Sequence, residues 1–266
     1  MQDWRGAGVV VTGAARGIGA AIAERLQAEG ARLVVADVLA EPLQQVADRL
    51  GAHPVAGDAA SPEGVRALVD AATDHLGEID VWVGNAGIAR GEGLAGSSEQ
   101  DWADSWQVNV MAHVRAAELL VPRWLERGSG RFVVTASAAG LLTILGQPTY
   151  AVTKHGAEAF AEWLAATYGH RGIAVHAICP QGVLTDMYPG PGDGELADVI
   201  GHDGALQPAD VAEALVRTVE AEEFLVLPHP EVKDYFAFRG AQTDKWLRGM
   251  QRLQQRVDQT THKLVE

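Results

Sequence analysis

The chain has 266 residues, 47% of them apolar, and a formal net charge of −14. This length and composition suit one globular α/β domain, whereas an acidic chain without a basic cluster argues against nucleic acid as a partner. No stretch approaches the roughly 20 apolar residues that span a bilayer, and residues 1–8 do not resemble a signal peptide. We therefore expect a cytoplasmic protein with no membrane partner.

Short apolar, β-branched runs alternate with longer helical segments along the chain. The runs lie at 9–11, 33–35, 81–83, 132–134, 173–178 and 224–227, with another strand ending before Asp58, and helical segments are expected at 20–29, 64–75, 102–126 and 150–168. Strand–helix alternation implies a parallel sheet covered on both faces. The fold class predicted is therefore α/β, a Rossmann-type doubly wound sheet.

Two regions follow from this division of the chain. Residues 1–228 are expected to form a single catalytic domain that binds cofactor and substrate. Residues 229–266 are expected to form a C-terminal helical extension, packed on the same domain or on a neighbouring subunit.

A glycine-rich turn follows the first strand and opens the first helix, with Gly13, Arg16, Gly17, Ile18 and Gly19 in the segment TGAARGIG. Glycines let the backbone approach a pyrophosphate closely, and the free N–H groups of a helix N-terminus favour an anion. The segment therefore predicts a dinucleotide site.

Asp37 ends the second strand, eighteen residues past Gly19. A carboxylate there accepts hydrogen bonds from the adenosine ribose hydroxyls and repels a 2′-phosphate. The next residue is Val38, which offers no compensating cation, although Arg16 could reach a 2′-phosphate. We weigh Asp37 more heavily and predict NAD as the cofactor. Asp58, with Ala59 beside it, either bonds the adenine amino group or is a helix N-cap or turn aspartate.

Tyr150 and Lys154 are four residues apart in a helical segment after Pro148, so they share one face. An ammonium beside a phenol is expected to lower the phenol pKa from about 10 toward neutrality, which suits proton exchange with an alcohol. Up to Pro228 the chain contains thirteen arginines and one lysine, which is Lys154. That exception suggests that a bulkier guanidinium does not serve at this position.

Taken together, these residues resemble the short-chain dehydrogenase/reductase family over about residues 6–228. The further matching pieces are Asn85-Ala86-Gly87, Asn109, Ser137 and Pro180-x-x-Val183-x-Thr185, in the family's order. The resemblance implies a Tyr150 acid/base, a Lys154 that holds the nicotinamide ribose, a Ser137 that binds the substrate oxygen, and an Asn109 that anchors a relay water. It also implies that Asn85, Ala86 and Gly87 line the cofactor ribose, that Ile18 lies against the cofactor, and that Val183 and Thr185 hold the carboxamide.

Three positions depart from the family pattern. Gly84 stands where Asn often precedes Asn85, Ala136 stands where a second Ser often precedes Ser137, and Gln181 replaces the usual Gly after Pro180. We expect the first two to be harmless. Gln181 lies near the expected nicotinamide and could contact substrate.

Other chemistry-bearing residues favour plainer roles. Cys179, the one cysteine, is read as a buried strand residue. The nine histidines lack metal-ligand spacing, so no metal is expected. Trp102, Trp106, Trp124 and Trp163 fall in helices that pair across dimer interfaces in the family, or else pack within the subunit.

The leading functional hypothesis is an NAD-dependent dehydrogenase that oxidises a secondary alcohol. The alternatives are a carbonyl reductase, which uses the same chemistry in reverse, and a catalytically silent NAD-binding regulator. Residues 141–145, with Met187 and Tyr188, are expected to line the pocket of a fairly bulky apolar substrate. A homotetramer, or a homodimer, is expected from the resemblance.

The C-terminal extension carries seven basic and five acidic residues from Pro228 onward, a net of +2, so the rest of the chain carries −14 − 2 = −16. Its apolar residues recur at spacings of 4, 3, 4 and 7, which predicts one stripe on a helix. They are Trp246, Met250, Leu253, Val257 and Leu264. The stripe is expected to pack on its own subunit or to dock across an oligomer interface, with Tyr235, Phe236 and Phe238 close to the pocket.

Overall fold

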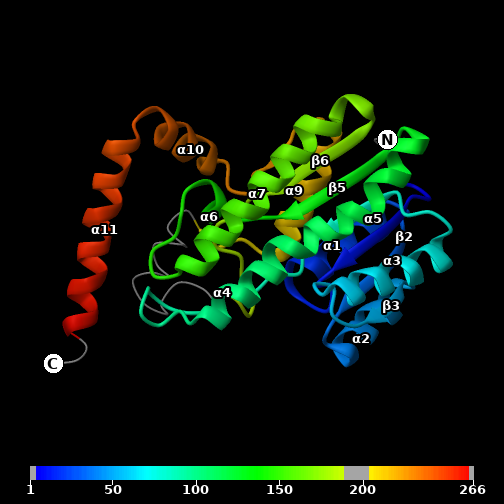
Figure 1. Ribbon diagram of the computed structural model, residues 1–266, viewed down its shortest axis with the longest axis horizontal. Helices are drawn as coiled ribbons and strands as arrows, with labels where there is room; N and C mark the ends of the chain where they lie inside the picture. The colour runs from blue at the N-terminus through cyan, green and yellow to red at the C-terminus, as the bar shows by residue number, and fades with distance from the viewer. Residues whose placement is uncertain (1–3, 189–203, 264–266) are drawn as a thin grey trace.

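A computed structural model of the chain describes residues 4–188 and 204–263, and the side chains up to residue 259. Within these ranges seven parallel strands form one sheet in the order β3-β2-β1-β4-β5-β6-β7 (Figure 1). The strands are β1 (Gly8–Thr12), β2 (Arg32–Asp37), β3 (His53–Ala56), β4 (Val81–Gly84), β5 (Gly130–Thr135), β6 (Ile173–Ile178) and β7 (Leu225–Val226). The predicted Rossmann-type sheet is confirmed.

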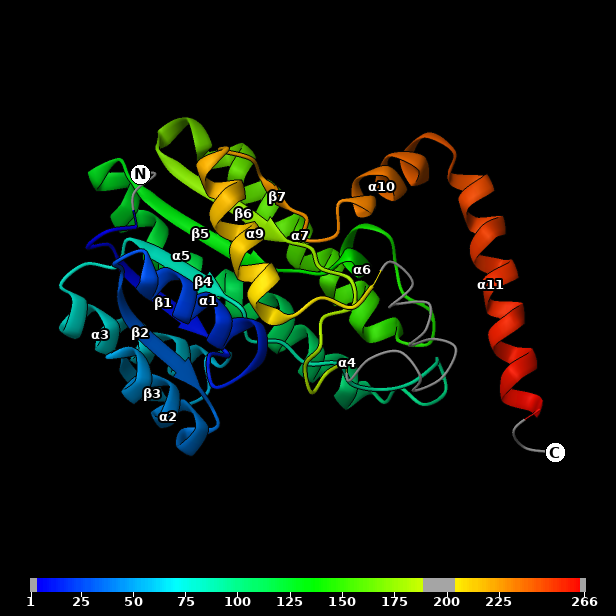
Figure 2. The ribbon, with the colours of Figure 1, turned by 180° about the vertical axis from the view of Figure 1, so that it is seen from behind.

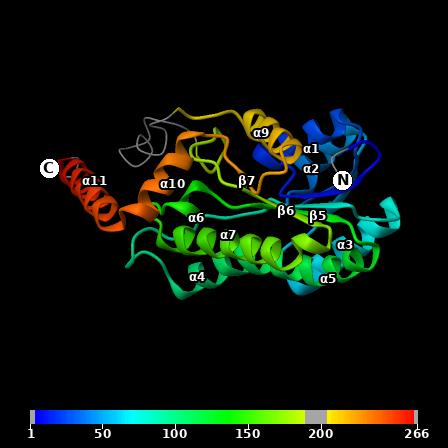
Figure 3. The ribbon, with the colours of Figure 1, turned by 90° about the horizontal axis from the view of Figure 1, so that it is seen from above.

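Helices cover both faces of this sheet, as Figure 3 shows from above. One face carries α1 (Gly17–Ala28), α2 (Ala40–Leu50) and α9 (Pro208–Glu220), and the other carries α3 (Pro62–Leu76), α5 (Ala112–Arg127) and α7 (Pro148–Tyr168). Successive residues of β1 belong to different cores: Val9 and Val11 pack with α1, whereas Val10 packs with α3. Each strand is apolar throughout because its side chains alternate between two buried faces.

The helical segment expected at 102–126 is interrupted. The structure divides it into α4 (Glu99–Trp106), a π-helical turn η1 (Gln107–Met111) and α5. Hydrophobic periodicity does not register such a turn, since helical sequence continues on both sides of it. A π-helical turn often marks a functional position, and here it contains Asn109.

Shorter elements complete the fold. They are α6 (Ala138–Leu141) after β5 and the 3₁₀ turn η2 (Gly169–Arg171) after α7. After β7 the chain leaves the sheet through α10 (Glu231–Ala241) and turns into α11 (Thr243–Lys263), which stands beside the body beyond α6 (Figure 2). Among the described helices, none combines the length and apolar character that crossing a membrane requires.

Candidate active site

One cavity of about 1360 Å³ opens at the carboxyl ends of the central strands. The order of strands reverses between β1 and β4, which is where doubly wound sheets hold their ligands. Most of the predicted site residues line this cavity: Gly13, Arg16, Gly17, Ile18, Asp37, Asp58, Ala59, Asn85, Ala86, Gly87, Ser137, Tyr150, Lys154, Pro180, Val183 and Thr185. Gly19 and Asn109 lie behind the wall, where they support it.

The glycine-rich turn is compact because two of its glycines leave no room for a side chain. Gly13 has φ +63°, and a Cβ on Gly19 would lie 2.1 Å from the Gly13 carbonyl oxygen. Asn85 braces the same turn, since its Nδ2 donates to the carbonyls of Thr12 at 3.0 Å and Gly13 at 3.1 Å. The turn and the loop after β4 are therefore held together on one side of the cavity.

The N-terminus of α1 points at this turn without a capping side chain. Arg16 is the N-cap residue, and its side chain makes no capping hydrogen bond. The backbone N–H groups of the first helical turn thus remain available for an anion. The Arg16 guanidinium instead pairs with Asp186, in the loop after β6 that lies next to the turn, and both side chains are largely exposed.

The two acidic residues of the cofactor end have different surroundings. Asp37 accepts hydrogen bonds from the backbone N–H groups of Ala15 and Leu39, both at 3.0 Å, and still faces the cavity. Asp58 accepts from Ala60 at 2.9 Å and Ser61 at 3.2 Å, just before α3. Asp58 thus makes the backbone contacts expected of a turn aspartate. It also lines the cavity, so a contact with the adenine of a bound cofactor stays a proposal.

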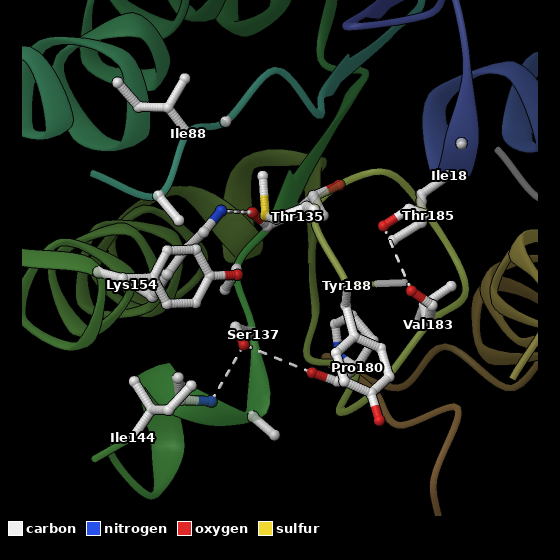
Figure 4. A pocket seen from close by; sticks show the side chains of 18 of the residues that line it. Ile18, Ile88, Thr135, Ser137, Ile144, Lys154, Pro180, Val183, Thr185 and Tyr188 are labelled. Carbon is white, nitrogen blue, oxygen red and sulfur yellow. Dashed lines mark hydrogen bonds between the residues drawn. The ribbon is translucent and has the colours of Figure 1, made fainter. Parts of the chain in front are cut away.

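Ser137, Tyr150 and Lys154 come from two elements and meet on the cavity wall. Ser137 follows β5, and its hydroxyl donates to the Pro180 carbonyl at 3.4 Å and accepts from Ala139 N–H at 3.1 Å (Figure 4). Tyr150 and Lys154 lie on α7, one turn apart. The Lys154 ammonium donates to the Thr135 carbonyl at 2.8 Å and lies 5.6 Å from the Tyr150 ring centroid.

The expected shift of the Tyr150 pKa toward neutrality is wrong for this structure. Burial raises the pKa of Tyr150 above its usual value of 10.0, and a hydrogen bond with Ser137 opposes that rise only in part. Lys154 lies beside the ring, but burial has the larger effect on the Tyr150 pKa. Burial in turn lowers the pKa of Lys154 to about 8. The desolvation of both groups outweighs their mutual effect.

Asn109 is fully buried in the π-helical turn and engages both neighbouring segments. Its Oδ1 accepts from Ile88 N–H, and its Nδ2 donates to the Ile88 carbonyl and to Thr153 Oγ1, all at 2.9 Å. Asn109 therefore links the loop after β4 to α7, and so fixes Lys154 relative to the loop that contains Gly87.

Gly84 has a steric partner that the sequence did not indicate. A Cβ at Gly84 would lie 2.5 Å from Nδ1 of His113, a fully buried residue of α5. Burial and the charge of Lys154 lower the pKa of His113 to about 3, so the imidazole is neutral. Gly84 and His113 are therefore complementary in size, a relation across 29 positions that no local motif displays.

The departure at Gln181 has a partner as well. Its backbone N–H donates to Nδ1 of His229 at 3.2 Å, and His229 is buried with its Nε2 3.1 Å from the Gly204 carbonyl. Because Nδ1 accepts from Gln181, Nε2 is the ring nitrogen that donates to the Gly204 carbonyl. The loop that contains Pro180 is thus tied to the segment where the C-terminal extension begins. Ala136, the other departure, is a buried residue of the cavity wall.

A family model described as short chain dehydrogenase matches residues 7–193. The chain belongs to the short-chain dehydrogenase family. A 3-oxoacyl-[acyl-carrier-protein] reductase of Vibrio cholerae is 33% identical over 67% of this chain and 74% of its own length. The 1-deoxy-11-beta-hydroxypentalenate dehydrogenase of Streptomyces exfoliatus is 34% identical over 84% of this chain and 83% of its own. A short-chain dehydrogenase from Burkholderia phymatum, solved in complex with NAD, superposes with a TM-score of 0.82 at 27% identity, covering 92% of this chain and 96% of that chain.

The remaining walls of this short-chain dehydrogenase are largely apolar. Residues 142–145, Met187 and Tyr188 line the cavity as expected, but Leu141 does not, because it ends α6 inside the core with 1% exposure. The extension contributes Tyr235 and Phe238, whereas Phe236 points outward with 40% exposure. Sequence reasoning missed Ile88, Gln147 and Asp186, which carry no motif of their own.

The other expectations concern residues away from this cavity. Cys179 is fully buried, and burial raises the pKa of its thiol to about 12. Trp124 packs in the core and donates to the Ile79 carbonyl at 2.8 Å, whereas Trp106 and Trp163 are exposed. The described side chains, those of residues 4–188 and 204–259, include no group of three His, Cys, Asp or Glu placed to hold a metal ion.

Proposed function

We propose that this chain is an NAD(H)-dependent oxidoreductase that interconverts a secondary alcohol and a ketone (EC 1.1.1 class). The observation that carries the proposal is the convergence of Ser137, Tyr150 and Lys154 on the cavity that the glycine-rich turn also lines. A protein that only binds a dinucleotide needs the turn, and can use Lys154 to hold the ribose, but it has no use for the hydroxyl groups of Ser137 and Tyr150.

NAD suits the residues at the cofactor end. The uncapped N-terminus of α1 and the glycine-rich turn provide N–H donors for a pyrophosphate. Asp37 faces the cavity and is followed by Val38 and Leu39, which carry no charge. Arg16, the residue that could favour a 2′-phosphate, is engaged by Asp186. The short-chain dehydrogenase from Burkholderia phymatum was itself solved with NAD.

The chain's own residues supply the proton chemistry. In oxidation the alcohol O–H proton passes to the Tyr150 oxygen, while the Ser137 hydroxyl donates a hydrogen bond that holds the substrate oxygen. The nicotinamide ring supplies hydride acceptance and donation when bound. Lys154 places a positive charge beside Tyr150, held by the Thr135 carbonyl and, through α7 and Thr153, by Asn109.

The substrate proposed is a fairly bulky apolar alcohol. Residues 142–145 and Met187 form an apolar wall near Ser137, and a hydrocarbon skeleton buried there gains about 0.8 kcal/mol per methylene group. The direction proposed is oxidation. Reduction of a ketone uses the same groups in reverse and is favoured by one observation, the similarity to a 3-oxoacyl reductase.

A panel of secondary alcohols, assayed by NADH absorbance, tests the proposal. We expect turnover with NAD, and we expect Tyr150→Phe to abolish turnover while NADH still binds with near-normal affinity by fluorescence titration. Tyr168→Phe, the same change at the far end of α7 and outside the cavity lining, serves as the matched control and should retain activity. Absence of turnover with every alcohol and with the corresponding ketones would contradict the proposal.

We further propose a body of residues 1–228, an arm of residues 229–266 and a homotetramer, with a homodimer as the smaller alternative. Trp106, Val152 and Trp163 support association, because they expose 42%, 48% and 54% of their surface on α4 and α7, which pack together. Light scattering should give about four times the 28.2 kDa chain mass. A mass equal to that of one chain would contradict the proposed oligomer but would leave the proposed reaction unaffected.

A further inference from the structure

The C-terminal arm is anchored to the body next to α6, the short helix that follows Ser137. Val232, in the first turn of α10, is fully buried in the main core. Farther along α10, the Arg239 guanidinium donates to the carbonyl of Leu141, at the end of the short helix that follows Ser137. The position of α10 is therefore fixed relative to the catalytic serine, although the arm lies outside the segment that the family model matches.

The helix α11 presents two different sides. Trp246, Met250, Leu253 and Val257 are half-buried, whereas Leu247 exposes 45% of its surface and Arg248 and Arg252 are exposed. The predicted stripe is thus confirmed over these four residues, and Leu264 lies outside the described residues. The Arg239 guanidinium also stacks 5.5 Å from the Trp246 ring centroid, which orients the start of the stripe.

The half-buried side of α11 belongs to the catalytic cavity. Trp246, Met250 and Leu253 line the same space as Ser137 and Tyr150, together with Tyr235 and Phe238 of α10. From Trp246 to Leu253 the stripe runs roughly 10 Å along the helix. Among the helices and strands described, α11 packs chiefly on α10 (Figures 1 and 2). A 21-residue amphipathic helix in this position needs an apolar partner for its stripe.

We propose that the arm forms the outer wall of the substrate site and selects secondary alcohols with a large apolar skeleton, such as fused rings, over small ones. The inference rests on the proposed function. The carbinol group lies at Ser137 and Tyr150, while the far end of the skeleton contacts Met250 and Leu253. The apolar partner of the stripe is thus the bound substrate, because the stripe residues line the same cavity as Ser137 and Tyr150.

The test compares a small and a large alcohol, 2-butanol and decahydro-2-naphthol, in full-length variants. For the double variant Met250→Ser/Leu253→Ser we expect kcat/KM for decahydro-2-naphthol to fall at least tenfold, while the value for 2-butanol stays within twofold. Leu247→Ser, a similar change on the exposed side of the same helix, is the matched control and should alter neither value. Equal effects on both alcohols, or no effect on either, would overturn the inference.

A binding measurement separates this inference from the proposed reaction. Titration with 2-decalone should change the tryptophan fluorescence of the wild type, less so in Trp246→Phe, and with at least tenfold weaker affinity in the double variant. Binding of this kind without turnover of any alcohol would support the role of the arm in substrate binding and refute the proposed function. An affinity for 2-decalone that the double variant does not change would refute the role of the arm.

Light scattering completes the test. A smaller assembly in the double variant, with kcat/KM for both alcohols equally lowered, would show that the stripe contacts a second copy of the chain instead of substrate.

Discussion

Asp37 is the residue to which we assign the choice between the two nicotinamide cofactors. Its carboxylate faces the cavity, and the one nearby guanidinium in the turn, Arg16, is paired with Asp186. We predict that kcat/KM with NAD exceeds that with NADP at least tenfold, about 1.4 kcal/mol. Asp37→Ser should lower the ratio of kcat/KM with NAD to kcat/KM with NADP, and Arg16→Gln should leave this ratio unchanged. Equal efficiency with both cofactors in the wild type would mean that Arg16 dominates.

Lys154 occupies a place that fits an ammonium and leaves little space for a guanidinium. It is 3% exposed, and its Nζ lies 2.8 Å from the Thr135 carbonyl and 3.2 Å from where a Cβ on Gly87 would be. We predict that Lys154→Arg lowers kcat at least a hundredfold although the charge is kept. Lys233→Arg, on the exposed surface of α10, should leave steady-state kinetics unchanged. If Lys154→Arg keeps most of the wild-type kcat, the hypothesis that this position requires an ammonium and excludes a guanidinium is wrong.

The raised Tyr150 pKa sets the sign of the pH dependence. Because burial keeps the phenol protonated near neutrality, only the small deprotonated fraction accepts the alcohol proton. That fraction grows tenfold per pH unit below the pKa. We predict that kcat/KM for oxidation rises steeply between pH 6 and 8, while kcat/KM for ketone reduction does not rise. Stopped-flow or steady-state pH profiles check this, and an oxidation profile flat over this range would contradict it.

At the scale of elements, β4 and α5 meet through Gly84 and His113. A methyl group on Gly84 would lie 2.5 Å from Nδ1 of a fully buried ring, so one element must shift. We predict that Gly84→Ala costs about 1–3 kcal/mol of unfolding free energy, measured by urea denaturation. Gly169→Ala, where a Cβ meets nothing within 4 Å, is the control.

A double-mutant cycle identifies the partner of Gly84. In the background of His113→Ala the cost of Gly84→Ala should largely vanish, because the added methyl group then occupies vacated space. If Gly84→Ala destabilises the His113→Ala variant as much as it destabilises the wild type, the added methyl group clashes with a residue other than His113.

The element predictions succeeded where one stretch of sequence carried the signal. The alternation of apolar runs and helical segments predicted the strands, and Pro62, Pro148 and Pro208 stand at the first turns of their helices. The interruption at Gln107–Met111 was not predicted, because the turn is short and no proline or glycine marks it in the sequence.

At the scale of the whole molecule, two buried neutral histidines make the fold sensitive to acid. Burial lowers the pKa of His113 to about 3 and that of His176 to about 4, from an ordinary value of 6.5. Between pH 6.5 and these values the unfolded chain binds more protons, so stability falls as pH falls. We predict that each histidine accounts for about 2 kcal/mol of the stability lost between pH 7 and 5.

His176→Asn isolates one of these contributions. An asparagine amide can replace the Nδ1–H donor that contacts the Glu223 carbonyl at 2.7 Å, but it does not titrate. Urea unfolding at pH 7 and 5 should therefore show a smaller loss in this variant than in the wild type. His170→Asn, at an exposed position, is the control. An equal loss in His176→Asn and the wild type would show that His176 charges without cost.

The sequence by itself determined the class of fold, the dinucleotide end and the identity of the residues proposed for catalysis. These depend on local spacing: a glycine-rich turn between a strand and a helix, and Tyr150 and Lys154 one helical turn apart. Only the tertiary structure decided what depends on residues far apart in the chain. The Tyr150 pKa follows from its burial, Arg16 is engaged by Asp186, Gly84 leaves space for His113, and α11 lines the catalytic cavity. Desolvation, ion pairing and packing act through space, so no pattern along the chain encodes them.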